Sequence, residues 1–407
     1  MRCIFSEISI FWVFVLCIQS YIDGTVLMGL VLLYLLYCIY KDRFQIRVPR
    51  ELKLGIFGAL VLCGSIIGIF YFEKYNIRDY IRDVYYFAQP IVYIYAGYMY
   101  FMKTEYKHDF YKTVVFSGFI VSCLYIIQII QNPSVLLSST VIDIRNSIGK
   151  ESFIILFSLF ALLTGKDGFN GLLHNLILII TAATFVLQFS RTSYGTLAFV
   201  ALAYMALQGR ITVKLLRNIA EICFGIGVIW VLLPNTLTSD FVMRIQKSLL
   251  EVSTNTSFST LQDVQSNWRG YEIHLVSSEL NNANLFAQLF GFGFGKTTAL
   301  DYTVNLGGQD FTQIATFHNG YIFVLLKNGI IGLIAYISFY LSMIIKYRKV
   351  DLYEARMLVS YSLGMLFLTY TKGGILRGSS VIEVCLYFGF CIGSIIRYTE
   401  VQNHTYE

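Results

Sequence analysis

Two arginines and one histidine stand at the edges of apolar segments, where charged groups are rare. Arg191 separates two apolar blocks with almost no loop between them, and Arg269 follows a tryptophan in the longest polar segment. His318 stands where that polar segment gives way to another apolar run. A guanidinium at the edge of a membrane is costly unless it is paired or solvated. These three residues are therefore the candidates for chemistry.

Their side chains suit the transfer of a sugar from a polyprenyl diphosphate to a hydroxyl group. Two guanidinium groups can hold a diphosphate bidentately and remain charged at any pH. An imidazole can accept a proton from a hydroxyl near neutral pH. The arginines would stabilise the charge on the departing diphosphate. Two structural interpretations stay open: His318 as an interfacial polar residue, and Arg269 as a surface-helix residue paired with Glu272.

A second motif, Gly291-Phe292-Gly293-Phe294-Gly295-Lys296-Thr297, is similar to a nucleotide-binding loop. A P-loop needs a glycine four residues before the Gly-Lys-Thr, and Phe290 stands there. A tight glycine turn leading to the next apolar run is the better interpretation. No Asp-x-Asp and no His-x-x-x-His pair is present, and the eight cysteines lie in or next to apolar blocks. The sequence therefore predicts no metal site, no disulfide framework and no cofactor.

The elements that must position these residues are transmembrane helices. The chain has 407 residues, of which 56% are hydrophobic and 14% are charged, whereas a soluble domain has about 25% charged residues. The apolar residues form blocks close to the ~20 residues that a membrane-spanning helix requires. No alternating pattern indicates a barrel. We therefore expect an all-α, polytopic transmembrane bundle.

The apolar blocks predict about twelve spans, in 1–233 and 318–397, around a long loop in 234–317 and before a tail in 398–407. The loop should contain helices at the membrane surface, in Asp240–Val252 and Asn267–Phe290. The candidate spans are Ile8–Ile22, Thr25–Tyr40, Leu54–Phe72, Val84–Met102, Thr113–Ile130, Ser152–Leu163, Leu172–Phe189, Tyr194–Leu207, Ile219–Leu233, His318–Ile345, Ala355–Tyr370 and Val381–Ile396.

The distribution of positive charge predicts the orientation. With the N-terminus in the cytoplasm, the inner segments hold 18 Lys and Arg residues and the short outer loops hold 8. This bias predicts that both termini are cytoplasmic and that the Pro234–Phe317 loop lies outside. The formal charge of +6 follows from these flanking residues, so nucleic acid is not an expected partner.

The order of these motifs resembles the O-antigen ligase and O-antigen polymerase superfamily. The resemblance covers about residues 140–345, and the rest of the chain is similar in hydropathy only. It is carried by Ser190-Arg191 closing one span, Trp268-Arg269-Gly270 in the long loop, the glycine turn Phe290–Gly295, and His318-Asn319 opening a span that continues with Leu325, Gly329 and Gly332-Leu333.

The resemblance implies a GT-C-like, metal-independent glycosyltransferase at the outer face of the bacterial inner membrane. Arg191 and Arg269 would match the family's diphosphate-contacting arginines, and His318 its acceptor-activating histidine. Arg145 and Asn319 are supporting candidates, although Lys150-Glu151 after Arg145 departs from the family's usual run. Lys327-Asn328 also departs from the family's pattern, at a place where many members have a glutamate.

Three functions remain open on the sequence. A polymerase of undecaprenyl-diphosphate-linked repeat units of a surface polysaccharide, O-antigen or capsule, is favoured, because such chains are often rich in Phe and Tyr, here 33 and 30. A ligase would move finished polymer to lipid A–core or another acceptor. A flippase or transporter is disfavoured by the missing internal repeat. The expected partners are lipid-linked oligosaccharides, the bilayer, a chain-length regulator and a flippase. The sugars, the linkage, the acceptor and the oligomeric state are not predicted.

Overall fold

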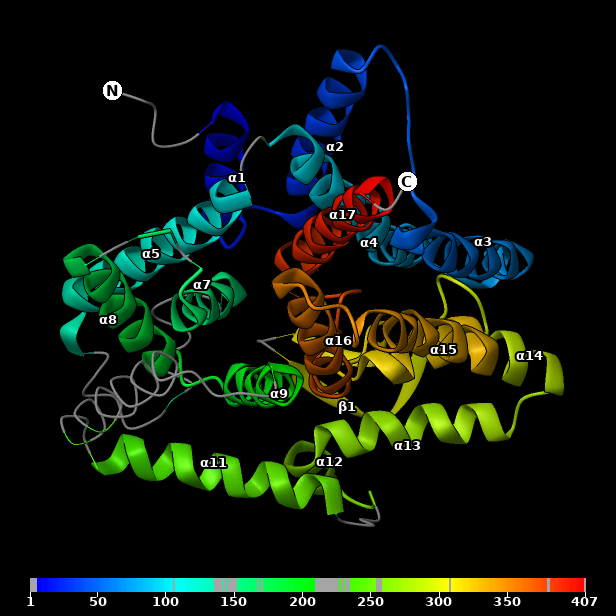
Figure 1. Cartoon of the computed structure of the whole chain (residues 1–407). Helices are drawn as coiled ribbons and strands as arrows, with labels where there is room; N and C mark the ends of the chain where they lie inside the picture. The colour runs from blue at the N-terminus through cyan, green and yellow to red at the C-terminus, as the bar shows by residue number, and fades with distance from the viewer. Residues whose placement is uncertain are drawn as a thin grey trace.

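The computed structural model describes residues 6–104, 107–134, 141, 144, 152–166, 168–169, 171–208, 227, 231, 235–253, 258–306, 309–378 and 381–405. This part of the chain forms fifteen α-helices, two short 3₁₀ helices and one β-hairpin. Figure 1 shows α16 in the middle of the view, α9 and α15 beside it, and α11, α12 and α13 along the lower edge. The helical class that the sequence predicts is therefore confirmed in its coarse form.

The elements begin and end as follows. They are α1 (Glu7–Ile18), α2 (Gly24–Lys41), η1 (Arg50–Leu52), α3 (Leu54–Phe70), η2 (Phe72–Lys74), α4 (Ile77–Lys103), α5 (Lys107–Gln131), α7 (Phe153–Thr164), α8 (Gly171–Leu187), α9 (Arg191–Gln208), α11 (Asn235–Ser253), α12 (Leu261–Ser266), α13 (Trp268–Asn281), α14 (Leu285–Phe290), β1 (Thr298–Leu306), β2 (Gln309–Ile314), α15 (Gly320–Tyr347), α16 (Tyr353–Thr371) and α17 (Val381–Thr405).

Four helices are long and apolar enough to cross a membrane, namely α2, α5, α15 and α17. Shorter apolar helices are α1, α3, α7 and α8. Each predicted span except Ile219–Leu233, which falls largely outside the described residues, overlaps one of the helices. The total of about twelve crossings stays a prediction, because helix length and composition support four.

The hairpin is the one element among the described residues that departs from the predicted all-α class. Strands β1 and β2 are antiparallel, with Thr298 opposite Ile314 and Leu306 opposite Gln309. The sequence explains the pairing, because Gly307-Gly308 between two strand-forming runs is a typical hairpin signal. The residues of the hairpin are too polar for a membrane span, so hydropathy alone does not reveal it.

Helix α17 forms the centre of the core. In the most apolar stretch of 18 residues, 83% of α17 is buried inside the protein, whereas the corresponding share of α2 is 28%. Helix α4 packs closely along α17, because Gly97 and Gly389 stand at the crossing: a Cβ added at Gly97 would lie 2.0 Å from the Leu386 carbonyl oxygen, and one at Gly389 1.9 Å from the Ile94 carbonyl oxygen. An alanine at either position would therefore push the two helices apart.

The outer helices expose apolar side chains in a way that suits a lipid environment. Leu33 and Leu36 of α2, Phe70 of α3 and Ile334 of α15 are each more than 60% exposed. Exposed apolar surface of this extent is unusual for a protein that water surrounds. The exposed residues lie on apolar helices, two of which are long enough to span a membrane.

Helix α16 defines the two ends of the bundle. Near its C-terminal end, Phe367 lies against Gly195 in the first turns of α9, and Thr369 lies against Gly320 at the start of α15. The N-terminal ends of α9 and α15 therefore share one end of the bundle. Arg191 begins α9 and His318 immediately precedes α15, so the helix packing brings both residues to that end.

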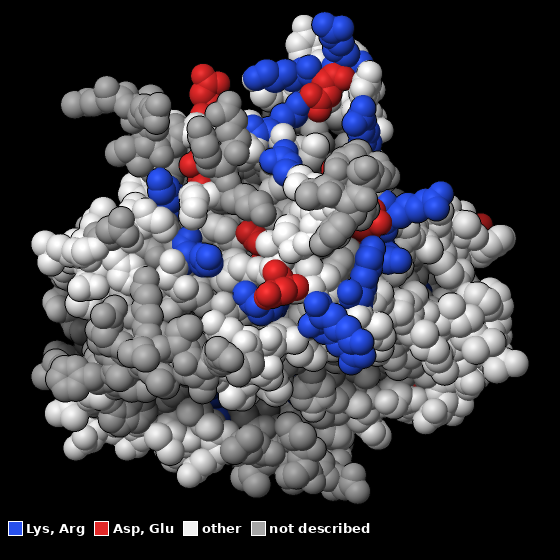
Figure 2. Space-filling view, in the orientation of Figure 1, with Lys and Arg blue, Asp and Glu red and all other residues white. Residues whose placement is uncertain are grey.

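Positive charge collects at the opposite end. Figure 2 shows Lys and Arg side chains over the upper and central part of the visible face, where Figure 1 has α2, α16 and α17. Lys103 at the end of α4 forms an ion pair with Asp42 after α2. Lys346 near the end of α15 pairs with Glu51 at 3.5 Å. The segments that the charge count assigns to one side of the membrane are thus joined to one another.

Candidate active site

His318 and Glu272 form the centre of the candidate site. The His318 Nδ1 atom lies 2.9 Å from Glu272 Oε1, and the His318 backbone N–H donates to Glu272 Oε2, also at 2.9 Å. The Glu272 side chain is 1% exposed, whereas the His318 side chain is 55% exposed. The Nδ1 edge of the imidazole is therefore bonded to a buried carboxylate, while much of the rest of the side chain is exposed.

This hydrogen bond decides which ring nitrogen can accept a proton. A carboxylate oxygen is an acceptor, so it holds the hydrogen of the neutral ring on Nδ1. The Nε2 lone pair is then left for another partner. When Nε2 takes up a proton, the adjacent carboxylate stabilises the resulting imidazolium, which is the role of the acid in a hydrolase triad. The arrangement is suited to general-base catalysis.

Glu272 is positioned by a rigid helix. Asn267 caps α13 by accepting a hydrogen bond from the Gly270 N–H at 3.0 Å. The Trp268 Nε1–H donates to Glu272 Oε1 at 2.8 Å, one turn along the same helix. Both carboxylate oxygens therefore accept hydrogen bonds, which offsets the cost of burying the charge. Glu272 accepts hydrogen bonds from His318 and Trp268. This arrangement argues against the ion pair with Arg269 that the sequence spacing allows.

Further contacts of α13 with the β-hairpin and the segment before it come from Tyr271 and Glu279. The Tyr271 hydroxyl lies 3.1 Å from Asp301 Oδ2 and accepts a hydrogen bond from the Asp301 backbone N–H at 2.8 Å. Burial raises the pKa of Tyr271 to about 12, so the hydroxyl keeps its proton and donates it to the carboxylate. Glu279 pairs with Lys296 and accepts a hydrogen bond from Thr298 at 2.9 Å. The hairpin missed from the sequence thus supports the helix that carries Glu272.

Two arginines belong to the segments that carry or contact His318 and Glu272. Arg269 lies in the first turn of α13, three residues before Glu272, and residues at this spacing share one side of a helix. Arg377 follows α16, and its Nη1–H donates to the Phe317 carbonyl oxygen at 3.2 Å, one residue before His318. Both arginines are half-buried. Arg377 is thus located next to His318 by a direct contact, whereas Arg269 is placed only by its position on the Glu272 side of α13.

Arg191 occupies a different position in the structure. Ser190 caps α9 by accepting a hydrogen bond from the Ser193 N–H at 3.2 Å. The Arg191 Nη1–H donates to the backbone carbonyl oxygen of Arg244 on α11, and α11 in turn packs against α13. Arg191 thus lies at the same end of the bundle as His318, and it contacts α11 there. Its contact with a diphosphate stays a prediction.

Of the two supporting candidates, Asn319 and Arg145, the structure describes Asn319. Asn319 is buried and caps α15, since its side-chain oxygen accepts hydrogen bonds from the Tyr321 N–H at 2.9 Å and the Ile322 N–H at 3.4 Å. It positions the segment that carries His318. Arg145 lies outside the described residues.

The glycine motif is a structural turn, as the sequence predicts. Gly291, Gly293 and Gly295 all have positive φ angles, between 79° and 90°. The backbone at Gly293 lies so close to α3 that an added Cβ would be 2.3 Å from the Gly68 nitrogen. The amide groups of Phe292 and Gly293 donate to carbonyl oxygens of α15, at 2.9 and 3.0 Å. These amides cannot also cradle a phosphate.

In the sequence, Glu272 is a candidate only as a possible partner of Arg269, and Arg377 is not a candidate site residue. Glu272 is 46 residues from its partner His318, and Arg377 is 60 residues from Phe317. The signal in the sequence is the three-residue spacing between Arg269 and Glu272. That signal is compatible with several local pairings, so it does not identify His318 as the partner.

Comparisons with known proteins assign no family. No protein-family model matches the chain, and no curated protein matches it. The function must therefore be inferred from the residues and their geometry.

Proposed function

We propose that this chain is a membrane glycosyltransferase that polymerises undecaprenyl-diphosphate-linked oligosaccharide repeat units of a surface polysaccharide. The observation that carries the proposal is the pairing of a largely exposed His318 with the buried Glu272, with Arg377 bonded to the neighbouring Phe317 carbonyl oxygen. A general base next to cationic groups is the equipment that transfer from a diphosphate donor requires.

The reaction would proceed by direct displacement. His318 Nε2 accepts the proton of an acceptor hydroxyl, and the hydroxyl oxygen forms a bond to the anomeric carbon of the donor sugar. The bond between that carbon and the diphosphate oxygen breaks, and the diphosphate leaves with the electron pair. Arg269 and Arg191 are the proposed contacts of the leaving diphosphate, and Arg377 is a third candidate from its place beside Phe317. Glu272 stabilises the imidazolium until the proton is released.

The membrane arrangement belongs to the same proposal. About twelve spans would cross the bacterial inner membrane, with both termini in the cytoplasm and the loop of 234–317 at the periplasmic face. The positively charged end of the bundle (Figure 2) would then lie in the cytoplasm. The candidate active site, at the other end of α16, would meet lipid-linked donors at the outer face.

The proposed function predicts a specific product in a reconstituted reaction. The purified chain, incubated with an undecaprenyl-diphosphate-linked repeat unit alone, should yield a ladder of lipid-linked polymers, equally with and without a chelator. Gel separation of labelled product measures this. A product that forms only when lipid A–core is added would identify a ligase. No transfer to either acceptor, in a sample that binds the donor, would contradict the proposal.

Glu272 should act through His318. Glu272→Gln keeps an oxygen that can accept the Nδ1–H but loses the charge that stabilises the imidazolium. We expect kcat to fall by roughly tenfold to a hundredfold, less than for loss of the base itself, with KM for the lipid-linked donor little changed. Glu272→Ala should lose more, because the hydrogen bond is lost as well. Equal kcat for Glu272→Gln and the unaltered chain would exclude this role.

A further inference from the structure

Residues 41–53 connect α2 to α3, and we name this segment the basic loop. Figure 1 shows it in the upper part of the view, between the upper end of α2 and α3, and Figure 2 shows Lys and Arg side chains gathered over the same region. All the Lys and Arg residues of the loop are exposed, namely Lys41, Arg43, Arg47, Arg50 and Lys53. The basic loop therefore presents concentrated positive charge at this end of the bundle.

The two acidic residues of the basic loop do not cancel its charge, because lysines from other helices pair with them. Asp42 forms an ion pair with Lys103 at the end of α4, and Glu51 Oε1 lies 3.5 Å from Lys346 Nζ near the end of α15. None of the loop's own Lys and Arg residues forms an ion pair with another residue that the structure describes. Their charge is therefore left for an anion outside the chain.

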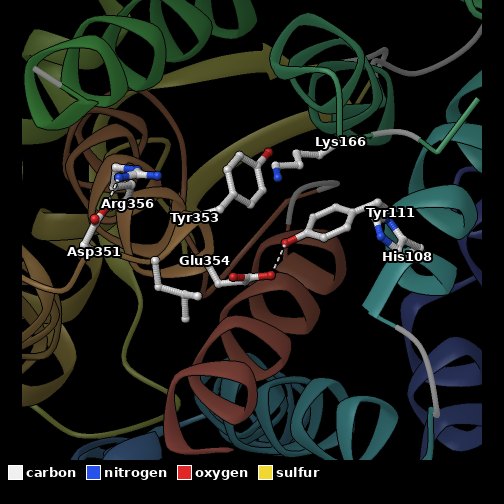
Figure 3. A pocket seen from close by; sticks show the side chains of 8 residues that line it. His108, Tyr111, Lys166, Asp351, Tyr353, Glu354 and Arg356 are labelled. Atoms are coloured by element: carbon white, nitrogen blue, oxygen red, sulfur yellow. Dashed lines mark hydrogen bonds and ion pairs between the residues drawn. The ribbon is translucent and has the colours of Figure 1, made fainter. Parts of the chain in front are cut away.

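Charge is balanced elsewhere at this end of the bundle, around the cavity at the start of α16 (Figure 3). Its lining holds Lys166 and Arg356 but also Asp351 and Glu354. Arg356 Nη1 lies 2.6 Å from Asp351 Oδ1, and Glu354 accepts a hydrogen bond from the Tyr111 hydroxyl at 3.2 Å. The excess of positive charge thus belongs to the basic loop and not to the cavity.

Exposed apolar side chains stand between the basic ones. Phe44, Ile46 and Val48 are 73%, 60% and 52% exposed, at every second position around Arg47. Exposing apolar surface to water is unfavourable, and a charge bias that only sets the orientation of a membrane protein requires the Lys and Arg residues alone. Basic residues interleaved with apolar ones are instead typical of a segment that lies on a membrane, with its apolar side chains in the boundary between headgroups and acyl chains.

Both ends of the basic loop are attached to the bundle. The loop begins at Lys41, the last residue of α2, and α2 is long and apolar enough to cross a membrane. At the other end Leu52 is fully buried, and η1 packs against α17. Residues 45–49 between these ends belong to no helix or strand. If α2 crosses a bilayer, the loop must therefore lie at the surface of that bilayer.

We propose that the basic loop binds anionic phospholipids in the leaflet at this end of the bundle. Arg43, Arg47 and Arg50 contact the headgroup phosphates, and Phe44 and Ile46 enter the boundary between headgroups and acyl chains. Each Lys or Arg beside an anionic leaflet strengthens binding by roughly fivefold. The proposal rests on the membrane arrangement proposed above, with α2 as a span, and it involves no step of sugar transfer.

Photolabelling of the full chain in a bilayer tests the proposal. The purified chain is reconstituted in phosphatidylcholine vesicles with a trace of a probe, either phosphatidylglycerol or phosphatidylcholine, that carries a diazirine beside its headgroup. Mass spectrometry of the peptides gives the yield of label in residues 41–53. We expect about tenfold more label from the phosphatidylglycerol probe, and a smaller difference at about 1 M salt, where the Debye length is ~3 Å. Equal labelling by the two probes would overturn the proposal.

Two double variants that each remove two positive charges separate the loop from the general charge of this end. Arg43→Gln/Arg47→Gln should lower the yield from the phosphatidylglycerol probe by about 25-fold, because each arginine contributes roughly fivefold. The matched control Lys166→Gln/Lys349→Gln lies at exposed positions outside the loop. It should change the yield by less than about twofold, because salt screens charges that do not contact the headgroup. Equal losses in the two variants would contradict the assignment to the loop.

Phe44→Ser/Ile46→Ser keeps every charge and removes the apolar contact. It should lower the yield by about tenfold, because two large apolar side chains leave the headgroup boundary, and an unchanged yield would overturn the proposal. Resistance of the reconstituted chain to alkaline extraction measures membrane insertion separately. A resistant chain whose loop is not labelled contradicts this proposal alone, whereas a labelled chain without sugar transfer contradicts only the proposed function.

Discussion

Replacing His318 with alanine is expected to slow sugar transfer by about 10²–10⁴-fold, the usual contribution of a general base. The side chain is 55% exposed, so its removal leaves no cavity in the core and the chain should still insert and fold. The rate of polymer formation by purified protein, normalised to donor binding, measures the effect. In cells, the long chains should disappear while single repeat units remain attached.

The matched control is His274→Ala. His274 is an exposed histidine on α13, two residues from Glu272 in sequence, and the proposed mechanism gives it no role. Its replacement should leave the rate within about twofold, as is usual for a surface substitution. If His318→Ala and His274→Ala both made chains of normal length, the assignment of the base would be wrong.

Arg269 allows a second test of the same site. Arg269→Ala should also abolish polymer formation, because the leaving diphosphate loses a bidentate contact. Arg269→Lys keeps the charge but not the planar pair of donors, so it should restore donor binding better than it restores kcat. Full activity of Arg269→Ala would remove this residue from the mechanism.

The sequence predicts more of the helices than of the contacts between them. Long runs of apolar residues predict α2, α5, α15 and α17, because the hydropathy of a segment depends only on the residues of that segment. The mixed pattern of the long loop likewise predicts α11 and α13. The pairing of His318 with Glu272 joins residues 46 positions apart, and no periodicity within either segment encodes it.

The interior of α15 likewise belongs to a predicted helix but makes contacts that the sequence does not predict. The sequence marks Lys327 as the main charge within a predicted span, and the structure buries it completely. Its partner Asp83 lies in α4, one residue before the predicted span Val84–Met102, so no pattern in either segment pairs the two residues. The break in α15 at Gly329, with φ 66° and ψ −167°, was also not visible, because a glycine is common in membrane helices.

The break in α15 explains why a charged pair is buried there. Because Gly329 departs from helical geometry, the Leu326 and Lys327 carbonyl oxygens are open to outside donors, and the glycine turn supplies them. Lys327 Nζ lies 2.6 Å from Asp83 Oδ2 and also donates to the Lys296 carbonyl oxygen. Asp83 Oδ2 accepts the Gly295 N–H at 2.9 Å. The pair thus ties the turn to α4 and α15.

Lys327→Met should therefore destabilise the protein by about 3–5 kcal/mol, because it removes the close counter-ion of the buried Asp83 carboxylate and leaves only Arg82, whose Nη2 atom is 3.9 Å from Asp83 Oδ1. Thermal unfolding of the detergent-purified chain measures the loss. The matched control Lys346→Met lies on the same helix, but its ion pair with Glu51 is half-exposed, and it should cost about 0–1 kcal/mol.

The double variant Asp83→Asn/Lys327→Met separates the charge from the packing. The asparagine oxygen can still accept the Gly295 N–H, and no unpaired charge remains in the interior. A buried ion pair replaced at both ends is often close to neutral in stability, so the double variant should recover more than half of the single variant's loss. If it were as unstable as Lys327→Met alone, the ammonium group would matter through its bond to the Lys296 carbonyl oxygen, and the glycine turn, not the charge on Asp83, would be what Lys327 stabilises.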